Sequence, residues 1–134
     1  MNTSDYIKAG MKEEISHRVE EEHTAAHVGS GSMRVLATPV MIAFMEQTAR
    51  DLLARYLPTG YSSVGVHVDV RHLAPTPLGS TVRVQCEVLE VDGSKVNFSV
   101  QAWDAVEQVG EGKHQRVVIN EERFLSRVNA KATL

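Results

Sequence analysis

The 134-residue chain has one cysteine, few aromatic residues (5%) and no large excess of positive or negative charge. Its single cysteine, Cys86, excludes an intrachain disulfide, so packing must hold the fold together. The formal net charge is −3 and no long run of like charge occurs, which argues against a nucleic-acid surface or a basic membrane-binding face. The longest uncharged apolar run, Val35 to Met45, is about half of what a bilayer requires. We therefore expect neither nucleic acid nor membrane as a partner.

The composition is that of one globular domain, with 43% hydrophobic and 23% charged residues. We treat residues 1–134 as that domain. The first residues have no apolar segment behind a basic start, so we expect no secretory signal. A lone cysteine is compatible with a reducing compartment, and the expected location is cytoplasmic.

One long helix is predicted in the middle of the chain. Thr38 suits the N-cap, Pro39 suits the first helical position, and Pro58 with Gly60 ends the helix after about Leu57. The first two turns are apolar nearly all round, so the front of the helix should be buried. The face expected at helical spacing consists of Met41, Phe44, Met45, Thr48, Leu52 and Tyr56.

Four segments after this helix alternate between apolar and polar residues, as half-buried strands do: 62–72, 80–88, 95–103 and 112–119. Asp92-Gly93 is a hairpin signal between the second and the third, and another strand is expected near 15–19. An antiparallel sheet wrapped around the single helix buries both apolar surfaces, which predicts an α+β fold. In the first segment, alternation predicts inward Val64, Val66, Val68 and Val70 and outward Gly65, His67, Asp69 and Arg71.

Three residues could carry acid–base chemistry. His72 continues the inward register at a strand end, and Glu46 is the first charge after the apolar run, eight residues beyond Thr38. An imidazole and a carboxylate that meet within or across subunits would form an acid–base pair. Each also has an ordinary structural interpretation: a hydrogen-bonded histidine, a solvent-facing carboxylate and a helix cap.

Other groups of residues give weaker indications of a functional site. His23 and His27 have the spacing of two zinc ligands on a helix, but no third ligand follows, so we predict no metal. Cys86 lies between inward valines and reads as a core residue. No phosphate-binding loop or nucleophile elbow is present, and no cofactor is expected.

The segments "ATPVMIAFMEQTA" and "VGVHVDVRHLAPTPLGSTVRV", followed by the Asp-Gly hairpin, resemble the hot-dog-fold acyl-CoA thioesterases and among them the fluoroacetyl-CoA thioesterase-like branch. The resemblance spans roughly Ile15 to Val118. It implies hydrolysis of an acyl-CoA thioester by Thr38, Glu46 and His72, with Gly65 against the bound thioester. It also implies a homodimer with sheets paired edge to edge, in which one site can draw Glu and His from different chains. Two such dimers could pair into a tetramer.

We expect residues near the helix start and the preceding loop to line the acyl pocket, and cations of the last strand to meet the phosphates of CoA. The loop "GSGSMRVLA" has no aromatic residue that could cover a very small fluorinated group, which favours a broader range of acyl-CoA substrates. Two alternatives are a hot-dog dimer that binds acyl-CoA without turnover and an enoyl-CoA hydratase or dehydratase, although the Asp–His pair typical of hydratases is not found. The expected substrate-binding residues are Gly65, Met33, Leu36, Met41, Phe44, Lys113, His114 and Arg116.

Overall fold

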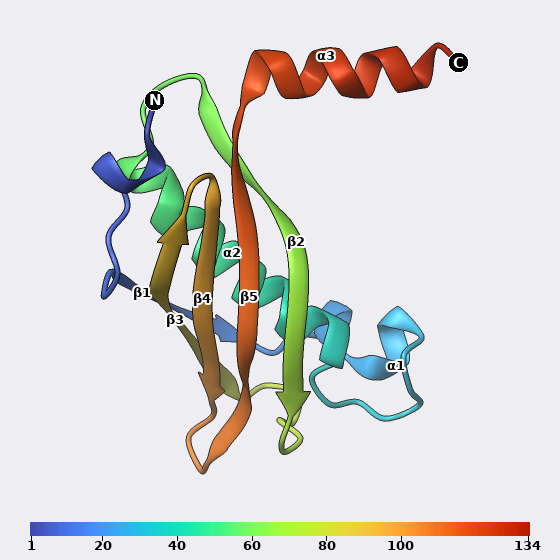
Figure 1. The fold of residues 1–134 in the computed structure, drawn as a ribbon. Helices are drawn as coiled ribbons and strands as arrows, with labels where there is room; N and C mark the ends of the chain where they lie inside the picture. The colour runs from blue at the N-terminus through green and yellow to red at the C-terminus, as the bar shows by residue number, and fades with distance from the viewer.

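The computed structural model describes residues 1–134 and consists of one antiparallel sheet crossed on one face by a long helix (Figure 1). The strands follow the order β1-β3-β4-β5-β2 across the sheet, so β1 and β2 form its two edges. The predicted α+β arrangement is thereby confirmed. The strands are β1 (Lys12–Arg18), β2 (Tyr61–His72), β3 (Thr81–Asp92), β4 (Lys95–Trp103) and β5 (Gln108–Asn120). The helices are α1 (Ala25–Val28), α2 (Thr38–Tyr56) and α3 (Glu121–Ala132), with short 3-10 turns η1 (Thr3–Asp5) and η2 (Glu21–His23).

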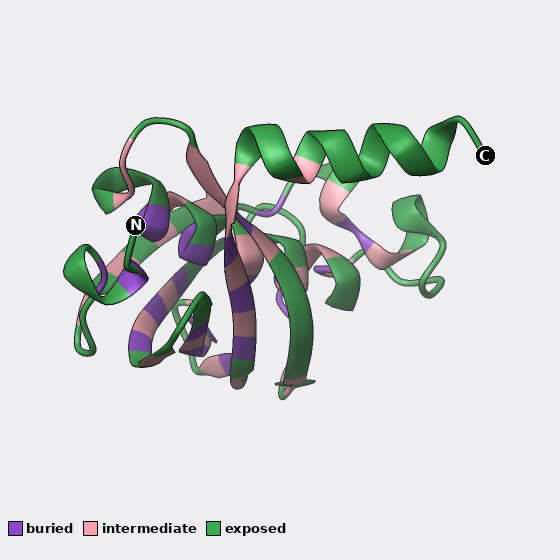
Figure 2. Cartoon of the chain, turned by 45° about the horizontal axis from the view of Figure 1, so that its top comes forward, coloured by how far each residue is buried: buried purple, intermediate pink, exposed green.

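The core lies between α2 and the middle strands, which alternate buried and partly exposed residues along their length (Figure 2). The predicted inward register of β3 and β4 is confirmed. Their inward residues are all fully buried: Val82, Val84, Cys86 and Val88 on β3, and Val96, Phe98, Val100 and Ala102 on β4.

Helix α2 begins one residue earlier than predicted, and this changes the role of Thr38. The N-cap is Ala37, whose side chain cannot cap, and Thr38 is the first helical residue. The prediction that Thr38 is the cap is therefore wrong, and its hydroxyl is available for another partner. At the other end Tyr56 is exposed, contrary to the prediction, because the buried face continues through Ala49 and Leu53 instead.

Strand β2 carries a β-bulge at Val66, and the bulge divides its register. Gly65 pairs with Arg116 and His67 pairs with Gln115, so Val66 has no opposite residue. An extra residue shifts side-chain parity by one. The predicted inward positions Val64 and Val66 are wrong, and Val66 is 52% exposed. Beyond the bulge the prediction holds for His72.

Helix α3 was not predicted. Asn120 accepts the backbone N–H of Arg123 and starts the helix, and Glu121 and Glu122 in the first turn suit its positive end. None of its residues is buried, and it projects beyond the edge formed by β2 (Figures 1 and 2). No helix of the chain is long and apolar enough to cross a membrane.

Candidate active site

Thr38 and His72 meet where α2 begins and β2 ends. The Thr38 Oγ1 atom lies 2.7 Å from His72 Nδ1, a strong hydrogen bond between a hydroxyl freed from capping and an inward histidine. Burial lowers the pKa of His72 below its ordinary value, so the neutral imidazole prevails near neutral pH. Its second nitrogen, Nε2, is buried and has no hydrogen-bond partner in the chain. Such an atom is poised to bond a group from outside the chain.

A pocket of about 340 Å³ opens beside this pair. Apart from two hydroxyls and the imidazole, its walls are apolar side chains, so it suits a small uncharged group better than an anion. Backbone bonds hold the wall in place: the Leu36 N–H donates to Thr76 O and the Ala37 N–H donates to His23 O. The lining residues are Ala25, Ser30, Val35, Leu36, Thr38, His72, Leu73, Ala74 and Pro75.

Glu46 lies on the next part of α2, pressed against Gly65 at the bulge. A Cβ atom on Gly65 would stand 2.8 Å from Glu46 Oε2, closer than such atoms approach one another. Any side chain at this point of the strand would displace the carboxylate, so glycine lets Glu46 take this position. The half-buried Glu46 side chain therefore lies between the helix and the edge strand, contrary to the alternative that it faces solvent.

Two buried polar residues of β5, His114 and Arg116, line the same spot. Arg116 donates from Nε to Ser63 Oγ at 2.9 Å and from Nη2 to Ser63 O at 3.1 Å. Its Nη1 lies 3.2 Å from His114 Nε2, and since guanidinium can only donate, this nitrogen accepts. His114 Nδ1 then carries the proton and donates to His67 O at 2.8 Å, next to the bulge.

The pKa values of His114 and Arg116 are both lowered. Burial is the main cause for His114, with the Arg116 charge adding to it, whereas the bond to His67 and the charge of Glu46 act the other way. Burial also lowers the pKa of Arg116, and Glu46 again opposes the shift. His114 is therefore a neutral member of the network, and Arg116 supplies its positive charge.

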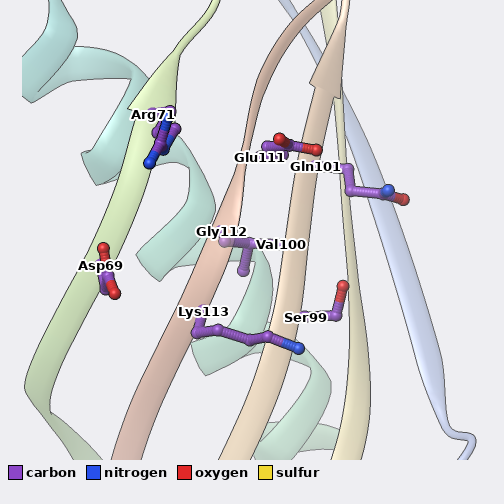
Figure 3. A pocket seen from close by; sticks show the side chains of 8 residues that line it. All are labelled: Asp69, Arg71, Ser99, Val100, Gln101, Glu111, Gly112 and Lys113. Carbon is purple, nitrogen blue, oxygen red and sulfur yellow. The ribbon is translucent and has the colours of Figure 1, made fainter.

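His114 and Arg116, which we expected among the residues that meet the phosphates of CoA, are buried inside the chain. They alternate inward with buried Val118, so the parity of β5 could have revealed their burial. Lys113 points to the opposite face of the sheet, among Asp69, Arg71 and Glu111, and away from α2 (Figure 3). The three basic residues Lys113, His114 and Arg116 thus do not form one cluster.

The predicted acyl-pocket residues also separate. Only Leu36 lines the pocket, while Met33 is 68% exposed and Met41 packs under Gly110 in the core. Phe44 is a core residue whose ring stacks on His17 with centroids 3.8 Å apart.

His23 and His27, which have the spacing of two zinc ligands, do not lie on one helix. His23 is in η2, where its Nδ1 accepts the N–H of Glu20, and it meets the Phe44 ring edge-on. His27 is exposed on α1.

Within one chain the two groups of candidate residues lie apart. Thr38 and Glu46 are separated by about 12 Å along the axis of α2, from eight residues at 1.5 Å each. Gly65 and His72 are separated by roughly 20 Å along β2. Both groups nevertheless lie on the helix-facing side of the same edge strand, which has a free edge.

The fold is the hot-dog fold. A hot-dog-like protein from Thermanaerovibrio acidaminovorans superposes with a TM-score of 0.90 at 28% identity, covering 98% of this chain and 97% of its own. A variant of the fluoroacetyl-CoA-specific thioesterase FlK, solved with fluoroacetate and CoA, superposes with a TM-score of 0.83 at 32% identity, covering 88% of this chain and 99% of its own.

The sequence comparisons narrow this class to one family. The model of the fluoroacetyl-CoA-specific thioesterase family matches residues 19–122. The fluoroacetyl-CoA thioesterase of Streptantibioticus cattleyicolor is 39% identical over 97 residues, which are 72% of this chain and 70% of that protein. The chain belongs to the fluoroacetyl-CoA-specific thioesterase family, as the resemblance predicted.

Proposed function

We propose that this protein hydrolyses acyl-CoA thioesters to a carboxylic acid and CoA, with Thr38, Glu46 and His72 as its catalytic residues. The observation that carries the proposal is the division of these groups along β2. A bonded Thr38–His72 pair stands at one end and Glu46 stands behind Gly65 at the bulge, on the same face. The family relationship supports the reaction class.

The two groups meet if β2 pairs antiparallel with β2 of a second copy. Because the bulge at Val66 removes one residue from the count, a twofold axis through Asp69 sets Gly65 of one chain opposite His72 of the other. Glu46 of one subunit then faces the Thr38–His72 pair of its partner, and two equivalent sites form. A strand of 12 residues with a free edge is a template for such pairing. We therefore propose a homodimer, and a tetramer of two such dimers as its further assembly.

Chemistry at this site needs a nucleophile, a proton carrier and donors for the oxyanion. In one route, Glu46 removes a proton from water, and the resulting hydroxide adds to the thioester carbonyl. The intermediate then collapses, the C–S bond breaks, and the departing thiolate takes a proton delivered through His72, whose Nδ1 is held by Thr38. The Thr38 N–H, which has no partner in the chain, stabilises the negative oxygen, whereas Pro39 has no N–H and those of Val40 and Met41 are bonded to Ala37 O.

In the other route, the Glu46 carboxylate attacks the carbonyl itself, CoA leaves, and water hydrolyses the mixed anhydride. Single turnover in ¹⁸O-labelled water separates the routes. After turnover, mass spectrometry finds ¹⁸O in Glu46 only if the anhydride forms and water attacks its glutamyl carbonyl.

The substrate range proposed is broader than fluoroacetyl-CoA. The pocket has no aromatic side chain, and its apolar walls with two hydroxyls suit short acyl groups in general. We keep the cytoplasm as the proposed location, since the one cysteine is buried and needs no oxidising environment.

A thiol-release screen over fluoroacetyl-, acetyl-, branched and aromatic acyl-CoA tests the proposal. Glu46→Ala and His72→Ala are each expected to lower turnover by at least about 10²-fold while leaving the unfolding midpoint near that of the wild type. Stoichiometric binding of CoA esters without thiol release would instead indicate a binding module. Loss of the enoyl thioester absorbance would indicate a hydratase.

Mixed dimers test the division of the site between subunits. When the inactive Glu46→Ala and His72→Ala chains are refolded together, one of the two sites in each mixed dimer regains both wild-type residues. Random assembly at equal amounts should restore about a quarter of wild-type activity. If both residues acted within one chain, the mixture would stay inactive.

A further inference from the structure

Helix α3 has an apolar face without a partner in its own chain. Phe124, Leu125 and Val128 lie on one side at helical spacing, and Leu125 and Val128 are 55% and 45% exposed. A helix of 12 residues is marginal in water unless its apolar face is buried. Something outside the chain is therefore expected to cover this face.

The position at which α3 starts indicates which partner covers its apolar face. Asn120, its N-cap, pairs with Tyr61, the first residue of the edge strand β2. From there α3 runs outward past this edge (Figure 1), into the space that a second copy paired on β2 occupies. The inference thus rests on the proposed dimer. In that dimer, Gly65 lies opposite the partner's His72, where the partner's β2 ends, so Tyr61 and the start of α3 lie beyond that end, near the partner segment that follows His72.

The partner segment that follows His72 is the rim of the pocket. Leu73 lines the pocket and is exposed, and Leu78 and Val28 are exposed apolar residues of neighbouring segments. We propose that α3 of each subunit packs its Phe124–Val128 face on this rim of the partner. The C-terminal helix of one chain then covers the Thr38–His72 pocket of the other.

Charge favours the same placement. Arg123, Arg127 and Lys131 form a stripe at four-residue spacing beside the apolar face, and none of them makes an ion pair in the chain. In each subunit, three exposed acids, residues 20–22, occupy the segment that leads to α1 and the pocket. Glu20 and Glu21 pair with Arg18 and Arg34 of their own chain, whereas Glu22 makes no ion pair. The cationic stripe of one chain therefore has Glu22 of the other as its free acidic partner.

Disulfide trapping tests the docking directly. Tyr61 and His72 are roughly 36 Å apart along β2, so Val128→Cys and Leu73→Cys cannot meet within one chain. The double variants Val128→Cys/Leu73→Cys and Val128→Cys/Leu78→Cys are oxidised mildly and run on a non-reducing gel. At least one should give a covalent dimer, whereas Val128→Cys/Tyr6→Cys, with a cysteine near the other edge of the sheet, should not.

Kinetics test the consequence for the site. Leu125→Glu/Val128→Glu places two charges on the docking face and is expected to raise the KM for acyl-CoA about threefold or more. The matched control Ser126→Glu/Ala130→Glu adds the same charge on the opposite face of α3 and should leave the KM unchanged. Both variants should keep the wild-type unfolding midpoint, because α3 contributes little to the core of its own chain.

The outcomes separate this inference from the proposed dimer. A monomer by light scattering, with no restored activity in the mixed-chain experiment, would overturn both. A dimer that restores activity but gives no covalent product, and in which both charge variants behave alike, would overturn only the docking of α3. Binding of α3 to anionic phospholipid vesicles, abolished by Leu125→Glu/Val128→Glu and without any trapped dimer, would assign the face to a membrane and also overturn the inference.

Discussion

Gly65→Ala is the substitution that most directly probes the site, because it adds one methyl group where the Glu46 carboxylate lies. The new Cβ would stand 2.8 Å from Glu46 Oε2 and 3.2 Å from His114 Cε1. His114 is fixed by two hydrogen bonds, whereas the carboxylate ends a flexible side chain. Glu46 should therefore move by roughly 0.5–1 Å, and such a displacement of a reacting group can cost up to about 10²-fold in rate.

The cost in stability should be much smaller. Alanine suits a strand better than glycine by about 0.5–1 kcal/mol, which offsets part of the crowding. We expect the free energy of unfolding to change by no more than about 1 kcal/mol, measured by guanidinium denaturation. Turnover, followed by thiol release, should fall about 10- to 100-fold.

A double-mutant cycle with Glu46→Ala decides whether the loss acts through the carboxylate. If it does, Gly65→Ala/Glu46→Ala turns over no more slowly than Glu46→Ala alone, because the displaced group is already gone. Additive losses would show that Gly65 acts on the substrate independently of Glu46. Unchanged turnover in Gly65→Ala would refute the placement of Glu46 at the reacting centre.

Three further predictions concern the buried polar groups. Burial lowers the pKa of His17, His72 and His114, so below about pH 6.5 the unfolded chain binds more protons than the folded one, and the free energy of unfolding should fall as the pH drops from 6.5. Arg116→Lys cannot reproduce the bonds to Ser63 and His114 and should lower the free energy of unfolding by about 1–3 kcal/mol in denaturant titrations. Burial raises the pKa of Cys86 to about 12, so a thiol reagent at pH 8 should modify it only after unfolding.

Each of these has a matched control. His17→Phe should reduce the acid sensitivity, whereas His27→Gln, at an exposed histidine, should leave it unchanged. Arg34→Lys on the surface should alter stability far less than Arg116→Lys. Rapid labelling of Cys86 in the native protein would contradict its burial.

The sequence predicted those elements in which local pattern and burial agree. Strands β3 and β4 follow strict alternation, so their inward faces were predicted correctly, and the helical spacing of α2 predicted its buried face except at Tyr56. In β2 the valines continue to alternate through the bulge, so periodicity alone assigned Val64 and Val66 to the wrong face. What turns Gly65 inward is its contact with Glu46, a residue 19 positions earlier, and a single-strand pattern carries no such information.

The candidate site, like the fold, was predicted from the sequence only in part. The grouping of Thr38, Glu46 and His72 came from family resemblance, and their joint catalytic role stays a prediction. Sequence pattern placed His72 correctly but could not show the bond to Thr38, which depends on how two distant segments meet. Helix α3 was not predicted, although Asn120 and the acids at 121–122 are a helix-start signal, because the helix buries no residue in its own chain and so has no broad apolar face.

The proposed role of Glu46 as a base or nucleophile requires unoccupied carboxylate oxygens, and the way Arg116 is bonded leaves them unoccupied. A carboxylate between a helix and a strand would ordinarily be neutralised by a direct ion pair, which would also occupy its oxygens. Here Arg116 directs its donors to Ser63 and His114 and forms no ion pair with Glu46. The guanidinium thus supplies a nearby positive charge, while the Glu46 oxygens stay free for water or substrate. The same bonds tie β5 to both sides of the bulge, so the charge and the opening at Gly65 are set by one network.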